Sequence, residues 1–242
     1  MRLWGIVCAF CFLLPLGAWN IIDGTTDGSA PWSRQILALA LENKWKLSLK
    51  RAGAAQALAD FKAGKADAVV LDENDVPRDL VCKKQVVYRF AAAVYVNANN
   101  TCTGLSRQEL EMLLSASRPT WKPITGNPED IHLYGLKSSA EGYGLFSRLA
   151  LKPGFEIKSP VYRTVSTGNV IKLCGANPVA MGFALFVPVE DEMVRPLAID
   201  GVEPNSENLK SGKYPLSVTH VLIYNAEAEP LPFSSVVVSN YP

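Results

Sequence analysis

A loop near the N-terminus combines small and hydroxyl-bearing residues immediately before a helix. Residues 24–29 contain two glycines, two threonines and a serine, between a short strand predicted at residues 20–22 and a helix predicted to begin at Pro31. Proline is favoured in the first helical turn, and the first N–H groups of a helix have no partner within it. Such a loop can therefore bind an anion, which makes Thr25 and Thr26 candidate ligands. The alternative is that Thr26 or Ser29 only caps the helix.

A carboxylate stands at the end of a predicted buried strand. Residues 66–71 are mostly apolar and end at Asp72. From residue 20 to this point the pattern alternates strand, helix, strand, helix and strand, which is typical of a parallel sheet with helices on both faces. Ligands of such sheets bind at the carboxyl ends of the strands, where the 24–29 loop is also expected. Asp72 is therefore a candidate ligand; the alternative is that it only caps the following turn.

A second strand, loop and helix repeat this arrangement in the middle of the chain. A predicted strand leads to Lys137, Ser138 and Ser139, and a helix follows in which Tyr143 and Phe146 are expected in the core. Lysine binds phosphate as a point charge, and hydroxyl groups can donate hydrogen bonds to it. Lys137, Ser138 and Ser139 are therefore candidate anion ligands, the alternative for Lys137 being a solvated loop charge.

Two long apolar stretches lie before and after this second unit. Residues 86–96 and residues 180–187 are both predicted as strands, and they are candidates for strands that cross between two lobes. Between them, Ser106 and Glu109 form a capping-box pattern that predicts a helix start. Further strands are predicted near the C-terminus, around residues 194–199 and 218–224.

The composition argues against several classes of protein. The chain has 242 residues, and 24 Lys and Arg against 23 Asp and Glu give a net charge of +1, so no basic excess suggests nucleic-acid binding. The two histidines, His132 and His220, cannot form a three-histidine zinc site. After residue 18 no Cys-x-x-Cys pattern occurs, and the chain has neither a Gly-x-Ser-x-Gly nor a phosphate-cradling Gly-Lys-Ser pattern. We therefore expect neither an enzyme nor a bound metal or cofactor.

The N-terminus has the order of a secretory signal. Met1 and Arg2 precede an apolar run over residues 3–14, and small residues follow up to Ala18. This run is shorter than the ~20 residues that span a bilayer, so we expect a signal peptide over residues 1–18, cleaved after Ala18. The exported chain would keep three cysteines, and an oxidising compartment permits one disulfide among them, with the pairing left open: Cys82, Cys102 and Cys174.

Seven sequence pieces in the same order make the chain resemble the periplasmic phosphate-binding protein family, among type 2 solute-binding proteins of ABC transporters. These pieces cover most of the chain after the signal peptide. They are Gly24-Thr25-Thr26 before the Pro31 helix; residues 58–67 running to Asp72; Ala93-Val94-Tyr95-Val96-Asn97; Trp121; Asn177-Pro178-Val179-Ala180-Met181-Gly182-Phe183; Gly201-Val202-Glu203-Pro204-Asn205; and Ser211-Gly212-Lys213-Tyr214-Pro215-Leu216.

The resemblance implies an α/β protein with the two-lobed type 2 periplasmic binding protein fold, in which mixed sheets are flanked by helices and two hinge strands join the lobes. Residues 19–90 plus 183–242 are expected to form one lobe and residues 91–182 the other. The implied function is that of a periplasmic or secreted binding protein for phosphate or a similar small oxyanion. It would work as a monomer, would bind no nucleic acid and would deliver its ligand to an inner-membrane ABC transporter.

The resemblance also assigns residues, and here the chain departs from the family. Thr25 and Thr26 match the first hydroxyl loop, and Asp72 matches the carboxylate that accepts the ligand's proton. In the second lobe, however, Leu136 takes the place of the family's arginine, and the Ser-Gly-Thr signature is replaced by residues 140–142. A second hypothesis is therefore a sensor or interaction module of the same fold that has lost high-affinity phosphate binding.

Overall fold

The computed structural model describes residues 18–25, 30–140, 142–189, 192–228, 231 and 238–239. Its centre is a mixed sheet with the strand order β2-β1-β3-β11-β4-β8-β6-β7, and β9 and β12 also pair with β4. The strands of this sheet are β1 (Trp19–Asp23), β2 (Leu47–Arg51), β3 (Ala68–Asp72), β4 (Cys82–Asn97), β6 (His132–Leu136), β7 (Val161–Thr164), β8 (Ala180–Leu185), β9 (Val194–Pro196), β11 (Ser217–Asn225) and β12 (Val238–Ser239). A separate pair consists of β5 (Gly104–Leu105) and β10 (Ala198–Ile199).

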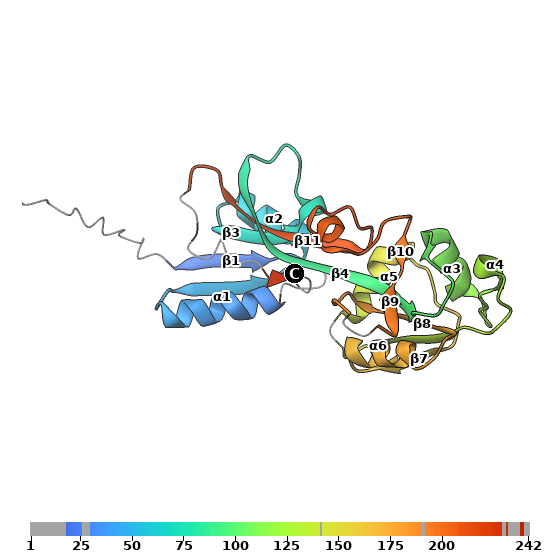
Figure 1. Cartoon of the computed structure of the whole chain (residues 1–242). Coiled ribbons are helices and arrows are strands. Elements are labelled where there is room, and N and C mark those ends of the chain that lie inside the picture. Colours follow the sequence, from blue (N-terminus) through green and yellow to red (C-terminus); the bar gives the residue numbers. More distant parts are fainter. Residues whose placement is uncertain are drawn as a thin grey trace, which may run out of the picture.

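Helices are distributed along the length of the molecule, on this sheet and beyond its end (Figure 1). They are α1 (Ala30–Glu42), α2 (Ala54–Lys62), α3 (Arg107–Ser115), α4 (Lys122–Thr125), α5 (Tyr143–Ala150), α6 (Thr167–Gly175) and α7 (Ser206–Lys210), with a short 3₁₀ turn, η1 (Glu73–Asp75). The predicted α/β alternation is confirmed, including the parallel pairing of β1 with β2 and with β3.

The long strand β4 runs through both halves of the molecule (Figure 1). Its first part pairs with β11, and its last part, from residue 92 onward, pairs with β8. The other long strand that the sequence predicted, β8, also pairs with β6. We propose the lobe boundaries expected above, with residues 19–90 plus 183–242 in one lobe and residues 91–182 in the other. The change of partner along β4 supports the boundary between residues 90 and 91.

Local sequence signals explain several helix ends. Ser106 caps α3, with the hydroxyl accepting from the N–H of Glu109 while the Glu109 carboxylate accepts from the N–H of Ser106, so the predicted capping box is confirmed. Ser166 caps α6 in the same position. These caps satisfy donors that the helix itself leaves unpaired.

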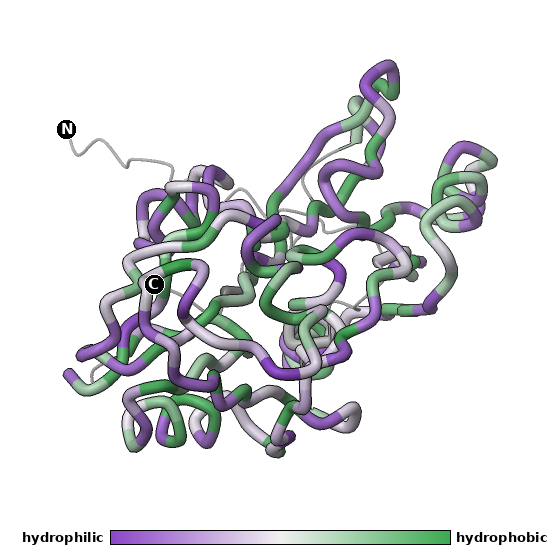
Figure 2. Tube along the Cα trace, turned by 90° about the vertical axis from the view of Figure 1, so that its right-hand side faces the viewer, coloured by the Kyte–Doolittle hydropathy of each residue, from purple (hydrophilic) through white to green (hydrophobic). Residues whose placement is uncertain are grey.

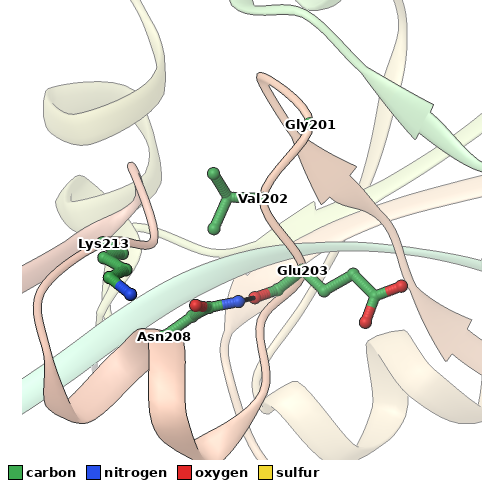
Figure 3. Close-up of a pocket in the computed structure, with 5 residues that line it drawn as sticks. All are labelled: Gly201, Val202, Glu203, Asn208 and Lys213. Carbon is green, nitrogen blue, oxygen red and sulfur yellow. Dashed lines mark hydrogen bonds between the residues drawn. The ribbon is translucent and has the colours of Figure 1, made fainter.

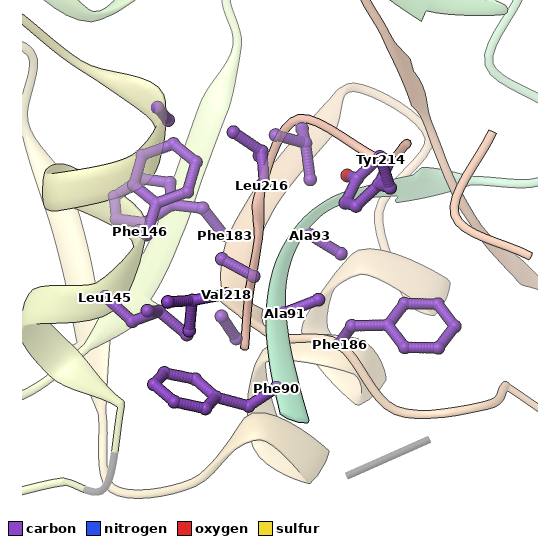
Figure 4. Packing of buried hydrophobic residues seen from close by; sticks show 14 of the residues in the cluster. Phe90, Ala91, Ala93, Leu145, Phe146, Phe183, Phe186, Tyr214, Leu216 and Val218 are labelled. Carbon is purple, nitrogen blue, oxygen red and sulfur yellow. The ribbon is translucent and has the colours of Figure 1, made fainter. Parts of the chain in front are cut away.

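Apolar residues from both halves join in one core where α5 meets β4 and β11. Figure 4 shows Leu145 and Phe146 of α5 near Leu216 and Val218. Phe146 also stacks on Phe183 at 4.5 Å between ring centroids. Along the trace, hydrophilic residues concentrate in the outer turns (Figure 2). This shared core fixes α5 relative to the first half of the sheet.

The three cysteines of the expected mature chain are free thiols. Cys102 and Cys174 are buried and Cys82 is partly buried, so the structure contains no disulfide among them. Burial raises the pKa of the Cys174 thiol to about 12, which fits the role of a small apolar core residue. The predicted signal peptide, apart from Ala18, lies outside the described residues.

Candidate functional site

Asp72 forms an ion pair that joins the two halves of the molecule. It is the last residue of β3, and its side chain is 9% exposed. Its Oδ2 lies 3.1 Å from Nη1 of Arg148, which α5 contributes from the second half of the sheet. Its Oδ1 lies 2.7 Å from Nε2 of His220, which stands opposite Asp72 on the antiparallel strand β11.

These neighbours keep Asp72 ionised. Burial by itself raises the pKa of this carboxyl, but the contact with His220 and the charges of His220 and Arg148 outweigh it, so the pKa of Asp72 lies below its ordinary value. An ionised carboxylate only accepts hydrogen bonds, and its two oxygens offer about four acceptor sites. The alternative that Asp72 caps the next turn is wrong, because its side chain makes no capping hydrogen bond to η1.

His220 is fully buried between the carboxylate and two aromatic rings. The ring of Phe90 meets it edge-on at 5.0 Å and that of Tyr88 at 5.6 Å, both measured between centroids. Among the described residues, Nδ1 of His220 has no hydrogen-bond partner. His220 therefore contacts Asp72 from the protein interior and has no access to solvent.

Thr25 lies at the same edge of the sheet as Asp72. The parallel register pairs Asp23 with Val70, so Thr25 and Asp72 both stand two residues beyond that pair, on neighbouring strands. Thr25 is buried, and its hydroxyl and N–H both donate to Oδ1 of Asp23, at 2.6 and 3.0 Å. The guanidinium of Arg51, at the end of β2, donates to the carbonyl oxygen of Thr25 at 3.3 Å. The other predicted residue of this loop, Thr26, lies outside the described residues.

The second-half candidates lie apart from these groups. Lys137, Ser138 and Ser139 are exposed, and the hydrogen bonds of this segment are made by its backbone, such as the N–H of Lys137 donating to the carbonyl oxygen of Thr164. Within the described part of the chain, no hydrogen bond or ion pair joins their side chains to Thr25 or Asp72. Their role as ligands stays a prediction, and their exposure favours the alternative of a solvated loop.

The helix that follows this loop corrects one expectation. Phe146 is in the core as predicted, but Tyr143 is 41% exposed. The guanidinium carbon of Arg163 lies 5.4 Å from the centre of the Tyr143 ring, and Nη1 of Arg163 donates to the carbonyl oxygen of Leu136. Tyr143, the first residue of α5, therefore packs against the Arg163 side chain instead of filling the core.

Gly142 occupies the place where the family has a threonine, and the backbone there requires glycine. Its φ is +78°, a left-handed conformation that side chains disfavour. A Cβ at this position would also lie 2.4 Å from Cγ and Cδ2 of Leu185. The missing hydroxyl is thus a consequence of how this loop packs.

The sequence did not predict three residues of this site: Arg51, Arg148 and His220. Arg51 had one local signal, since it directly follows a predicted strand whose end lies at the ligand edge. Arg148 and His220 had none, because they reach Asp72 from distant parts of the chain. The observed site is therefore richer in cations than the sequence predicted.

Other features of the described surface lie elsewhere. One depression, of about 600 Å³, is lined by Gly201, Val202, Glu203, Asn208 and Lys213 (Figure 3). There the side-chain amide of Asn208 donates to the carbonyl oxygen of Glu203, a contact that steadies the start of α7. Among the described residues, no group of three or more His, Cys, Asp or Glu could hold a metal ion. None of the helices in the described ranges combines the length and apolar character that crossing a membrane requires.

Comparison with curated proteins finds relatives of one kind. The chain is 28% identical over 154 residues to the phosphate-binding protein PstS of Bacillus subtilis, a match that covers 63% of this chain and 50% of that relative. It is 26% identical over 160 residues to PstS of Pseudomonas aeruginosa, covering 58% of this chain and 49% of the relative. The chain thus spans about half the length of the curated relatives it matches. No family model matches the sequence.

Solved structures give the fold. An ABC-type phosphate transport receptor from Vibrio cholerae superposes with a TM-score of 0.66 at 18% identity, over 90% of this chain and 92% of the receptor. PstS from Borrelia burgdorferi gives 0.67 at 18% identity, over 88% of each chain. The predicted two-lobed type 2 binding-protein fold is confirmed. Together the comparisons support the resemblance to the periplasmic phosphate-binding protein family, at low sequence identity.

Proposed function

We propose that this protein is an exported solute-binding protein that holds phosphate, or a similar small oxyanion, where β1 and β3 end. One observation supports this most: Asp72 and the Thr25 loop stand at neighbouring strand ends, and Arg148 reaches the same carboxylate from the second half of the molecule. Groups from both lobes therefore meet where the resemblance predicts the ligand.

The chemistry of Asp72 suits a protonated oxyanion. Because its pKa is lowered, the Asp72 side chain is a carboxylate that accepts a hydrogen bond from a protonated ligand oxygen. It has no proton with which to donate a hydrogen bond to a fully ionised ligand. Phosphate near neutral pH retains a proton and sulfate does not, so an acceptor-only group discriminates between them. Hydrogen bonds to ionised groups are worth about 1.5–3 kcal/mol each, so a few suffice for binding.

Export and transport complete this proposal. The apolar N-terminal run is the basis for placing the protein in the periplasm or outside the cell, and the kinship with phosphate-binding proteins suggests delivery of the ligand to an inner-membrane ABC transporter. No catalytic role is proposed, in keeping with relatives that are binding proteins.

A second function is favoured by the state of the site itself. Both Asp72 oxygens already have close contacts, and the hydroxyl of Thr25 donates to Asp23. A ligand would have to compete with these contacts, which lowers its affinity. This arrangement fits a sensor or interaction module of the same fold that no longer binds phosphate strongly.

Calorimetric titration of residues 19–242 separates the two functions. We expect saturable phosphate binding, weaker than a fully equipped site would give, and no binding once Asp72→Ala is combined with Thr26→Ala. Asp75→Ala is the matched control, since Asp75 is an exposed carboxylate in the next turn and its loss should leave binding unchanged. Titrations without heat for phosphate, sulfate, arsenate and methylphosphonate alike would overturn the oxyanion-binding proposal and favour the sensor.

A further inference from the structure

We infer that Arg148 is the second-lobe cation that contacts the bound oxyanion, in place of the arginine that Leu136 replaces. This inference rests on the proposed oxyanion-binding function and names a determinant of its affinity. The position is unexpected, because Arg148 belongs to the last turn of α5 and not to the loop before it.

The packing of α5 explains how Arg148 reaches the first lobe. Leu145, Phe146 and Ala150 are buried and fix the helix against the shared core (Figure 4). Helical side chains lean toward the helix N-terminus, so Arg148 extends back along α5. Its Nη1 ends 3.1 Å from Asp72, across the junction of the two halves.

The same contact makes Arg148 suitable for anion recognition. A guanidinium offers five donors in a rigid plane, and the Asp72 contact fixes that plane next to the carboxylate expected to accept the ligand's proton. The Arg148 side chain is 29% exposed as a whole, while its Nε and Nη2 atoms are buried at the junction of the two halves. A protonated oxyanion would thus present its hydroxyl to Asp72 and its charge to Arg148.

The other second-lobe cations near the family's ligand loop are poorer candidates. Arg163 donates to the carbonyl oxygen of Leu136 and lies over the Tyr143 ring. Lys137, which the sequence favoured, is exposed, and among the described residues its side chain makes no hydrogen bond or ion pair with the first lobe. Of these three cations, Arg148 alone has an ion pair with a residue of the first half.

Titration of variants with inorganic phosphate tests the assignment. We expect Arg148→Gln to weaken phosphate binding about 10- to 100-fold, the loss of one charge-assisted contact, and Arg148→Lys to give an intermediate affinity. Arg118→Gln should stay within about twofold of wild type. Arg118 is the matched control because it is an exposed second-lobe arginine that also pairs with an aspartate, Asp130, at 2.7 Å.

Chemical protection of the wild-type protein separates ligand contact from mere support of Asp72. Phosphate should slow the modification of Arg148 by phenylglyoxal at least fivefold and leave that of Arg118 unchanged, as read by peptide mass spectrometry. This measurement also serves if Arg148→Gln does not fold.

The outcomes distinguish the two proposals. Phosphate binding by wild type together with unchanged affinity in Arg148→Gln, or no protection of Arg148, overturns this inference while oxyanion binding stands. Absence of oxyanion binding by wild type overturns the proposed function, and this inference with it.

Discussion

Gly142→Ala is the substitution that best tests why the second-lobe signature is missing. The left-handed conformation at φ +78° costs a residue with a side chain about 1–2 kcal/mol. The close approach of the new Cβ to Leu185 adds about 1 kcal/mol, the low end for overpacking, because the end of a leucine side chain can turn away. We expect Gly142→Ala to lower the free energy of unfolding by about 2–3 kcal/mol.

The assay is urea unfolding of residues 19–242 followed by tryptophan fluorescence, with Gly144→Ala as the matched control. Gly144 lies in the first turn of α5, the helix that Gly142 precedes; it is exposed, and a Cβ there would meet nothing within 4 Å. Removing an exposed glycine from a helix should raise the free energy of unfolding by about 0.5–1 kcal/mol. Equal effects of the two substitutions would refute the reasoning, since only Gly142 is held by its conformation and by Leu185.

The cost at Gly142 bears on ligand binding. Threonine is β-branched and would meet Leu185 with more atoms than alanine, so restoring the family residue should be at least as destabilising. A hydroxyl side chain therefore cannot return to position 142 without a change in the backbone there. An oxyanion site in this protein must instead draw its second-lobe contacts from other groups, which is the place that Arg148 is inferred to take.

Two further predictions concern protonation and thiol access. Asp72 has a lowered pKa in the folded state, so its contribution to stability is complete above about pH 4, the ordinary aspartate value, and is lost as the pH falls through the folded pKa. The stability gap between wild type and Asp72→Asn, measured by urea unfolding, should thus narrow below pH 4; a gap constant from pH 7 to pH 3 would contradict this. For the thiols, we expect Ellman's reagent to label Cys82 in the native protein while the buried Cys102 and Cys174 react only after unfolding, and three equally fast thiols would show that the described burial is wrong.

The local parts of the fold could be predicted because their signals lie within a few residues. The capping box at Ser106 and the buried strand ending at Asp72 depend on neighbours in sequence, and both appear as expected. The parallel edge that holds Asp72 beside the Thr25 loop followed from the alternation of strands and helices. The spacing of apolar residues was enough to predict these elements, because each of them buries one side against the same sheet.

The partners of Asp72 could not be predicted because they come from tertiary pairing. Arg148 is separated from Asp72 by 76 residues, and the angle at which α5 packs decides where its side chain ends. His220 faces Asp72 because β11 inserts between β3 and β4, an order that no local pattern specifies. A buried histidine within an apolar strand has the same sequence signature whether or not it faces a carboxylate.

The motifs behind the resemblance are mostly structural, and this separates the question of fold from that of ligand. Trp121 is buried and donates from Nε1 to the carbonyl oxygen of Val179, whose N–H in turn donates to Asn177. Asn205 caps α7, and Tyr214 is part of the shared core (Figure 4). Residues of this kind hold any member of the fold together whatever it binds. The resemblance is therefore a stronger argument for the two-lobed fold than for phosphate, and the ligand depends on the few groups around Asp72.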